Sequence, residues 1–420
     1  MRRWVPIVVS LAACRGHFDA EHDAPAPGGP DALGACIAQV SLGGNTAFVL
    51  RGDGTIAAWG RNSFGASGIG SFSPAMIDAP TQVLTAPGGG AFDHVIAISG
   101  GVEQTPCALR DDGTAWCWGL NTWGQVGNAA TGSGTQTGVP SPAQVVGGGG
   151  AALAGVAEVV AGEESTCARK TDGTVWCWGW NMYGQLGGSG LSASTAPVEV
   201  FARGGTAVLA AGVMVSYGHA CAWDATGQLS CWGWNSAGQL GIGSTTDQAF
   251  AQPVALTGVV AAISAYLFTC ALLGDGSVYC FGDNTYGQLG DGNIGAAAGE
   301  LTPVPVTVAP AGAGLGSVAE IGAGDAHACA RKTDGTVWCW GSNMVGQLGT
   351  GELVPAEAPS PVQVQLPGAA LALRVGNNFA CAVLAGDALW CWGDNAYGEL
   401  AIGTFDTPSD LPARTMSACP

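Results

Sequence analysis

Twelve of the 15 cysteines in this 420-residue chain form six pairs, and the members of each pair are ten residues apart. Each pair flanks a short turn, which in most copies has Asp or a similar residue before Gly, as in Asp112-Gly113. Counting outward from a three-residue turn places the cysteines at a non-hydrogen-bonded site, where Cα atoms are about 4.5 Å apart and a disulfide can form. We predict six cross-strand disulfides, which join Cys107 with Cys117, Cys167 with Cys177, Cys221 with Cys231, Cys270 with Cys280, Cys329 with Cys339 and Cys381 with Cys391.

Two other states of these cysteines are open to sequence reasoning. They can be reduced thiols that pack as small apolar groups. They can also bind a metal as thiolates, but two thiolates on one hairpin have no further ligands near them in the sequence. The first repeat favours the disulfide interpretation, because Phe48 and Ala58 replace both cysteines of the pair together. We expect no metal site.

A different cysteine chemistry is expected at the N-terminus. Arg2 and Arg3 precede an apolar run that ends in Leu11-Ala12-Ala13-Cys14. This order of segments is typical of a secretory signal, and the run is too short for a transmembrane helix. With its Cys, the segment resembles the bacterial lipoprotein box, which implies removal of residues 1–13 and attachment of lipid to Cys14. An ordinary secretory signal is the alternative.

The chain after this signal divides into two parts. Residues 14–35 are rich in Ala, Pro, Gly and Asp, and we expect a flexible tether. Residues 36–420 carry the repeats described below. Cys36 opens the first repeat and Cys419 ends the last, so a disulfide between Cys36 and Cys419 would close a ring. Arg15 follows the lipidated position, which in enteric bacteria implies the outer membrane.

We find no catalytic constellation and expect no cofactor. Two of the three repeat-region histidines, His219 and His327, stand two residues before a hairpin cysteine and are interpreted as structural. An enzymatic alternative remains: Asp283 and Asp394 hold equivalent positions in two repeats, where carboxylates near a central channel could act on a glycan. Solvated loop residues are the simpler interpretation of both.

The elements that position these residues come from one repeated pattern, Trp-Gly-x-Asn-x-x-Gly. Its seven copies begin at Trp59, Trp118, Trp178, Trp232, Phe281, Trp340 and Trp392. In the third copy, residues 156–160, 166–169, 175–178 and 196–200 have the composition of four short strands bounded by turn residues. A period of roughly 50 residues with short strands predicts an all-β, seven-bladed β-propeller with about four antiparallel strands per blade.

The repeat resembles the regulator of chromosome condensation repeat. The residues that carry the likeness in the sixth copy are 327–330, 334–343 and the tetrad Gly346-Gln347-Leu348-Gly349. The resemblance covers roughly residues 36–420 and implies a seven-bladed propeller closed between its N- and C-terminal segments. Eukaryotic members of this family bind chromatin and exchange guanine nucleotide on a small nuclear GTPase, and similar bacterial propellers include a secreted inhibitor of β-lactamases.

One position of the motif varies freely, namely the residue between Gly and Asn. Because its neighbours are fixed, we interpret it as free of packing duty and as a candidate partner-binding position. Trp180 and Trp234 in adjacent repeats would form an apolar patch on one face, and aromatic side chains are frequent at interface hot spots. The seven residues are Arg61, Leu120, Trp180, Trp234, Asp283, Ser342 and Asp394.

The charge excludes several partners. Loss of Arg2 and Arg3 with the signal would leave eleven Lys and Arg against 31 Asp and Glu, a formal charge of −20. Such a surface repels nucleic acid and anionic lipid. We therefore expect a lipid-anchored protein of the bacterial envelope that is not an enzyme, whose monomeric propeller binds an envelope or extracellular protein. An extracellular enzyme and, by family resemblance alone, a nucleotide exchange factor are the alternatives.

Overall fold

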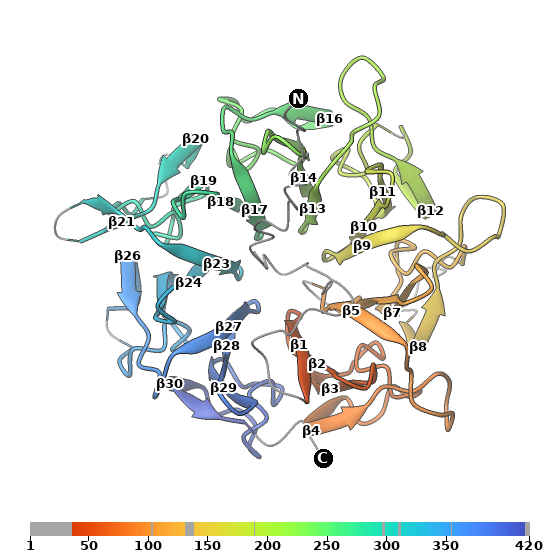
Figure 1. Cartoon of the computed structure of the whole chain (residues 1–420), viewed down its shortest axis with the longest axis horizontal. Helices are drawn as coiled ribbons and strands as arrows, with labels where there is room; N and C mark the ends of the chain where they lie inside the picture. Colours follow the sequence, from red (N-terminus) through yellow and green to blue (C-terminus); the bar gives the residue numbers. More distant parts are fainter. Residues whose placement is uncertain are drawn as a thin grey trace, which may run out of the picture.

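The computed structural model describes residues 36–101, 104–130, 138–188, 190–295, 299–309, 312–353 and 355–415. The predicted signal, Cys14, the predicted tether up to residue 35 and Cys419 lie outside these residues. Every regular element described is a β-strand, and seven four-stranded antiparallel sheets surround a central axis (Figure 1). The predicted seven-bladed propeller is confirmed. No helix in the described part of the chain is long and apolar enough to cross a membrane.

Each blade uses four consecutive strands, and the first strand of every blade lies nearest the axis (Figure 1). A further short hairpin, β21–β22, follows the fifth blade. The strands are β1 Ile37–Leu42, β2 Thr46–Arg51, β3 Ile56–Arg61, β4 Met76–Gln82; β5 Val95–Ser99, β6 Cys107–Arg110, β7 Ala115–Leu120, β8 Gly138–Gln144; β9 Val156–Ala161, β10 Ser165–Lys170, β11 Val175–Trp180, β12 Ala193–Glu199; β13 Gly212–Val215, β14 His219–Trp223, β15 Leu229–Gly233, β16 Gln248–Pro253; β17 Val259–Ser264, β18 Phe268–Leu273, β19 Val278–Gly282, β20 Glu300–Pro305; β21 Thr307–Val308, β22 Ala313–Gly314; β23 Val318–Ala323, β24 His327–Lys332, β25 Val337–Ser342, β26 Glu357–Gln363; β27 Ala370–Val375, β28 Phe379–Leu384, β29 Ala388–Gly393 and β30 Ser409–Arg414.

The central hairpins of the first six blades have the turn chemistry expected from the sequence, whereas the turn of the seventh blade ends on Asp387 with φ 58° in place of Gly. In the second blade, Arg110 N–H donates to Thr114 O at 3.0 Å, and the turn between them ends on Gly113 with φ 74°. The Asp112 carboxylate accepts hydrogen bonds from the backbone N–H and the hydroxyl of Thr114. The three-residue turn with a left-handed last residue is therefore confirmed, and it sets the register that pairs the cysteines.

All six predicted disulfides are present. The paired cysteines are directly opposite in register, their Cα atoms lie 4.0–4.1 Å apart, and each is at most 1% exposed. The bridges join Cys107 to Cys117, Cys167 to Cys177, Cys221 to Cys231, Cys270 to Cys280, Cys329 to Cys339 and Cys381 to Cys391.

Two other positions bear on the same prediction. In the first blade, Phe48 and Ala58 face each other at the site that the cysteines occupy elsewhere. The joint replacement noted in the sequence is therefore a replacement of one cross-strand pair by another. Cys36 is also disulfide-bonded, whereas its predicted partner, Cys419, lies outside the described residues.

Replacing one blade's disulfide by the first blade's apolar pair tests its contribution to stability. We expect the double variant Cys167→Phe with Cys177→Ala to lower the free energy of unfolding by roughly 2.5 to 3 kcal/mol, because the bridge closes a loop of about 11 residues in the unfolded chain. Urea unfolding of the oxidised proteins measures the difference. The control is the same comparison under reduction, where the wild-type advantage should disappear; an advantage that persists would contradict the prediction.

The motif tryptophans join neighbouring blades. Each of the six is fully buried, and its indole N–H donates to a backbone carbonyl in the tetrad loop of the preceding blade at 2.8–3.0 Å. In the fifth blade Phe281 has no such donor, and Gln239 O accepts the hydroxyl of Thr269, as Gln125 O accepts that of Thr166 in the third blade. The acceptors of Trp59, Trp118, Trp178, Trp232, Trp340 and Trp392 are Glu399, Ala66, Gln125, Gln185, Gln288 and Gln347.

The ring closes by packing of the seventh blade against the first. Their apolar side chains share one core cluster that includes Trp59 and Phe379. Arg374 in β27 is 3% exposed and donates from Nε to Val40 O in β1 at 2.8 Å. Its guanidinium also pairs with the buried Glu320 of the sixth blade. One buried arginine thus connects three blades where the chain ends meet.

Candidate functional site

Two sets of loops emerge from the same face of the ring, which we call the motif face. The first and third strands of every blade run in the same direction, because the four strands are consecutive and antiparallel. The turn after the first strand and the motif loop after the third strand therefore leave the sheet at one end. Backbone hydrogen bonds join them: Trp180 N–H donates to Glu164 O, and Trp234 N–H to Gly218 O, both at 2.8 Å.

The motif Asn organises its own loop. All seven are at most 6% exposed. In the third blade, Asn181 Oδ1 accepts the backbone N–H of Leu186 at 2.8 Å and its amide donates to Leu191 O, and the other six copies repeat this pattern. The recurrence of Asn therefore has a structural cause.

The variable position is less independent of packing than the sequence suggested. Leu120, Trp180 and Ser342 are at least nine-tenths buried, so they present little surface to a partner. Asp283 and Ser342 also accept hydrogen bonds from the tetrad glutamines Gln288 and Gln347. The interpretation of this position as free of packing duty is wrong for these four residues. Arg61, Trp234 and Asp394 are half-buried at the motif face.

Trp180 and Trp234 do belong to one aromatic patch, as predicted. We define the aromatic patch as Trp123, Trp180, Tyr183, Tyr217, Trp234 and Tyr266. Ring centroids of touching members lie 5.0–6.2 Å apart, from the second blade to the fifth. Tyr183 and Trp234 are stacked with an interplanar angle of 14°. Trp180 is 8% exposed and forms the floor, whereas Trp123 and Tyr266 are 39% and 40% exposed.

Carboxylates lie beside this patch. Glu164 Oε1 accepts the Trp123 indole N–H at 3.2 Å. Burial, and then the negative charges of Glu164 and Glu163, raise the pKa of Tyr217 to about 12. Burial and the charge of Glu163 also raise the pKa of Tyr266. Both hydroxyls therefore stay protonated at neutral pH and can donate hydrogen bonds.

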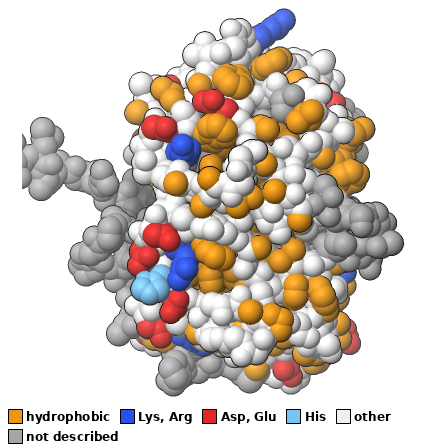
Figure 2. Space-filling model, turned by 90° about the vertical axis from the view of Figure 1, so that its right-hand side faces the viewer, with side chains coloured by type: hydrophobic (Ala, Val, Ile, Leu, Met, Phe, Trp, Pro, Cys, Tyr) orange, Lys and Arg blue, Asp and Glu red, His pale blue; other side chains and the backbone are white. Residues whose placement is uncertain are grey.

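Charge is distributed unevenly between the two faces. Among the described Lys and Arg residues, only Arg61 belongs to a motif-face loop; it lies over the Tyr397 ring at 4.9 Å. Most of the others stand at the far ends of the second strands, beside the Asp-Gly turns. Besides the buried Glu399, the motif-face loops carry the acidic residues Glu163, Glu164, Asp247, Asp283, Asp291, Asp325, Glu352, Asp394 and Asp406. Figure 2, which views the disc from its rim, shows sparse charges among hydrophobic and uncharged polar atoms.

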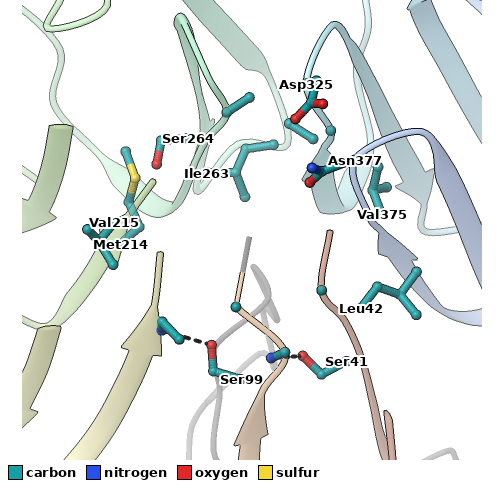
Figure 3. A pocket seen from close by; sticks show the side chains of 18 residues that line it. Ser41, Leu42, Ser99, Met214, Val215, Ile263, Ser264, Asp325, Val375 and Asn377 are labelled. Carbon is teal, nitrogen blue, oxygen red and sulfur yellow. Dashed lines mark hydrogen bonds between the residues drawn. The ribbon is translucent and has the colours of Figure 1, made fainter. Parts of the chain in front are cut away.

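The polar side chains that line the central channel include residues that connect neighbouring blades. The C-terminal ends of the first strands surround it, with Ser41, Ser99, Ser264, Asp325 and Asn377 among the lining residues (Figure 3). Ser41 and Ser99 accept hydrogen bonds from the backbone N–H groups of Gly100 and Ala161 in the next blade. Asp283 and Asp394, the carboxylates of the enzymatic alternative, do not line the channel and instead accept hydrogen bonds within their own loops.

The histidines His219 and His327 are fully buried in equivalent positions, and burial lowers the pKa of each to about 3. His219 Nε2 bonds the Thr269 hydroxyl at 2.9 Å, and Nδ1 lies 3.3 Å from the Ser216 hydroxyl. Among the residues that the structure describes, neither ring nitrogen of His327 has a partner. Within the ranges given above, no group of three or more His, Cys, Asp or Glu could hold a metal ion.

A single substitution should supply the missing partner of His327. Ala380 holds the position in the seventh blade that Thr269 holds in the fifth, one residue after a strand-opening Phe. We expect Ala380→Thr to raise the free energy of unfolding by about 1 kcal/mol, because a buried donor or acceptor gains a hydrogen bond. Thermal unfolding measures the gain. Ala380→Val adds the same volume without the hydroxyl, and an equal gain in that control would refute the hydrogen-bond explanation.

Sequence reasoning missed the turns after the first strands. Tyr217, Tyr266, Glu163 and Glu164 occupy these turns and complete the aromatic patch and its acidic border. The signal was present in the sequence, because these residues stand just before each hairpin and differ between otherwise similar copies. Their position beside the motif loops required the antiparallel order of the strands.

The fold and this face define a class of protein: a seven-bladed β-propeller with one aromatic, acidic face. Two family models, both described as "Regulator of chromosome condensation (RCC1) repeat", match residues 37–66, 156–185, 318–347 and 372–399, and residues 112–169, 172–223, 275–331 and 334–383. Together they cover more than half of the chain. The chain belongs to the RCC1 repeat family.

The relatives have diverse activities. The chain is 27% identical to the ultraviolet-B receptor UVR8 of Arabidopsis thaliana over 87% of its own length and 78% of the receptor. It is 28% identical to the human E3 ubiquitin-protein ligase HERC2 over 70% of its length, but it spans only 6% of that ligase.

Solved structures confirm the fold. Prp20p of Saccharomyces cerevisiae, a structure described with its binding to Gsp1p and histones, superposes with a TM-score of 0.71 at 20% identity, over 91% of this chain and 88% of that one. Human WBSCR16 superposes with a TM-score of 0.71 at 19% identity, over 86% and 94% of the two chains. Propellers of this family include proteins that bind other proteins.

Proposed function

We propose that this chain is an exported, lipid-anchored propeller that binds another protein through its motif face. The aromatic patch is the single observation that carries the proposal. Trp123 and Tyr266 contact other rings of the patch, yet each still exposes about two fifths of its surface. Exposed, clustered aromatic side chains are typical of interface hot spots. The fold alone would not support this function, because unrelated activities use the same scaffold.

The cysteines support the proposed export. Six buried disulfides in one domain fit an oxidising compartment, because cytosolic thiols are kept reduced. Cys14 follows a segment with the order of a signal and would receive the lipid. A single propeller on a tether of about 20 residues could reach partners well beyond the membrane surface.

Affinity capture tests the binding function. The full chain, carrying an affinity tag, is cross-linked to its neighbours in envelope extracts and purified. The same is done with the double variant Trp123→Ala with Tyr266→Ala. We expect at least one protein to be captured by the wild type and lost, by tenfold or more, with the variant. Tyr286→Ala is the matched control, because Tyr286 is 36% exposed on the same face and stands outside the aromatic patch. Equal capture by wild type and double variant would refute the motif face as the binding face.

Metabolic labelling tests the anchor. We expect labelled fatty acid to be incorporated by the wild type and not by Cys14→Ser, and the wild type to fractionate with membranes. A labelled Cys14→Ser protein, or an unlabelled wild type, would refute lipid attachment at Cys14.

A further inference from the structure

We propose that the aromatic patch recognises a cationic segment of the partner protein, with Arg or Lys side chains lying flat on its rings beside Glu163, Glu164 and Asp325. This inference rests on the motif face being the binding face. It goes further by assigning the chemistry of the partner.

The packing of the rings determines the shape of the ligand. Touching rings lie 5.0–6.2 Å apart and the Tyr183–Trp234 pair is stacked, so no slot remains between rings for an engulfed cation. Trp180 closes the floor at 8% exposed. A ligand must lie across the outer surface of several rings. An extended polypeptide segment fits this surface, and planar guanidinium groups stack well on aromatic faces.

The electrostatics determine the sign of the ligand's charge. Glu163 and Glu164 act on the Tyr217 hydroxyl, and Glu163, Asp325 and Glu164 act on that of Tyr266. These carboxylates therefore lie close to both tyrosine hydroxyls, and Glu164 also accepts the indole N–H of the exposed Trp123 at 3.2 Å. A cation placed on these rings gains attraction from the carboxylates as well as from the ring faces. An anionic ligand would be repelled by the same groups.

The distribution of charge over the face excludes a second copy as the occupant. Besides the buried Glu399, the described motif-face loops hold nine acidic residues and Arg61, so two such faces would repel each other. Arg61 lies at the first blade, over the Tyr397 ring of the seventh, whereas the aromatic patch spans the second to fifth blades. A groove of about 450 Å³, lined by Tyr183, Met182 and Asp247, adjoins the aromatic patch at Tyr183.

The test uses two peptide probes of nearly equal shape that differ in charge and in one hydrogen-bonding group per side chain. One is a nine-residue Arg-Gly peptide, and the other has citrulline in place of each Arg, which keeps the planar shape and removes the positive charge. Binding to the full chain is measured by fluorescence anisotropy at 150 mM salt. We expect the Arg peptide to bind and the citrulline peptide to bind at least tenfold more weakly. Equal binding of both peptides, or binding of neither, would overturn the proposal.

Variants separate the aromatic patch from the overall negative charge. Two double variants, Trp123→Ala with Tyr266→Ala and Glu163→Gln with Glu164→Gln, should each weaken the Arg peptide tenfold or more. A third, Asp172→Asn with Asp275→Asn, removes two charges from the Asp-Gly turns of the opposite face and should change affinity less than twofold. Equal losses in the two charge variants would assign the binding to net charge and overturn the proposal.

Three further outcomes are informative. Neutral oligosaccharides that bind the aromatic patch in place of the Arg peptide, or self-association of the wild type that the aromatic variant abolishes, would overturn the cationic assignment. The wild type could also capture a protein through Trp123 and Tyr266 and yet not bind the Arg peptide. That result would support the proposed binding function and refute only the cationic assignment.

Discussion

Glu399→Gln is expected to stabilise the protein by about 3 kcal/mol at pH 8 and by far less at pH 4.5. Glu399 is fully buried in the tetrad loop of the seventh blade, where five other blades have Gln. Burial, and to a lesser extent the charge of Asp394, raise its pKa from the ordinary 4.5 to about 7. The substitution removes a carboxylate that is ionised at pH 8 in a buried site.

The sign of the pH dependence follows from the raised pKa. The folded protein holds the Glu399 proton more tightly than the unfolded chain does. The stabilisation from that proton is complete below pH 4.5 and is lost as the pH rises through about 7. The difference between the Gln variant and wild type should therefore grow over this interval, while the contributions of other groups cancel.

The fifth blade provides the matched control. Gln288 Nε2 donates to Asp283 at 2.8 Å there, and Asp283 occupies the position that Asp394 has in the seventh blade. Glu399→Gln should form the same hydrogen bond with Asp394. Gln288→Glu should reproduce the arrangement of the seventh blade and lower stability at pH 8. Urea unfolding from pH 4.5 to 8 measures both, and a difference that is flat with pH would show that Glu399 is not the titrating group.

Arg374→Met is expected to lower the free energy of unfolding by about 3–5 kcal/mol. The substitution removes a buried cation that pairs with Glu320 and donates to Val40 O across the ring closure. Glu320 is 1% exposed and, among the described cations, would keep Arg331 as its partner at 2.7 Å. An incompletely compensated buried carboxylate is costly in a low-dielectric interior.

The double variant Arg374→Met with Glu320→Ala isolates the electrostatic part. Met214 already occupies the register of Arg374 in the fourth blade, opposite the first hairpin cysteine, and Ala261 occupies that of Glu320 in the fifth. We expect the double variant to recover much of the lost stability, because no buried carboxylate remains at this site. Arg331 can then turn to solvent. Urea unfolding measures both proteins, and a double variant as unstable as the single would assign the loss to packing volume.

The local part of this structure was readable from the sequence. Cysteines ten residues apart around Asp112-Gly113 predicted the hairpin, its register and the disulfide between Cys107 and Cys117, because a turn of fixed length determines which residues face each other. The seven copies of the motif predicted the number of blades. These inferences depend only on residues within one repeat or in neighbouring repeats along the chain. The repeat pattern in the sequence is therefore enough to make them.

The candidate site depended on contacts between repeats. The sequence identified Trp180 and Trp234, yet placed Trp180 at the surface when it is the floor of the aromatic patch. It treated Asp283 and Ser342 as free, although each accepts a hydrogen bond from the tetrad glutamine five residues later. It did not associate Tyr217 and Tyr266 with the motif loops, because the two sets of loops meet only at the ends of antiparallel strands.

The sequence by itself determined the blade, the number of blades and the covalent pairing, because turn geometry and strand register are local properties. Only the tertiary structure decided which loops share a face, which aromatic rings stay exposed and where charge gathers. The physical reason is that burial and electrostatic field depend on all neighbours in space. In this ring those neighbours come from adjacent blades, and at Arg374 they come from the first and the sixth blades.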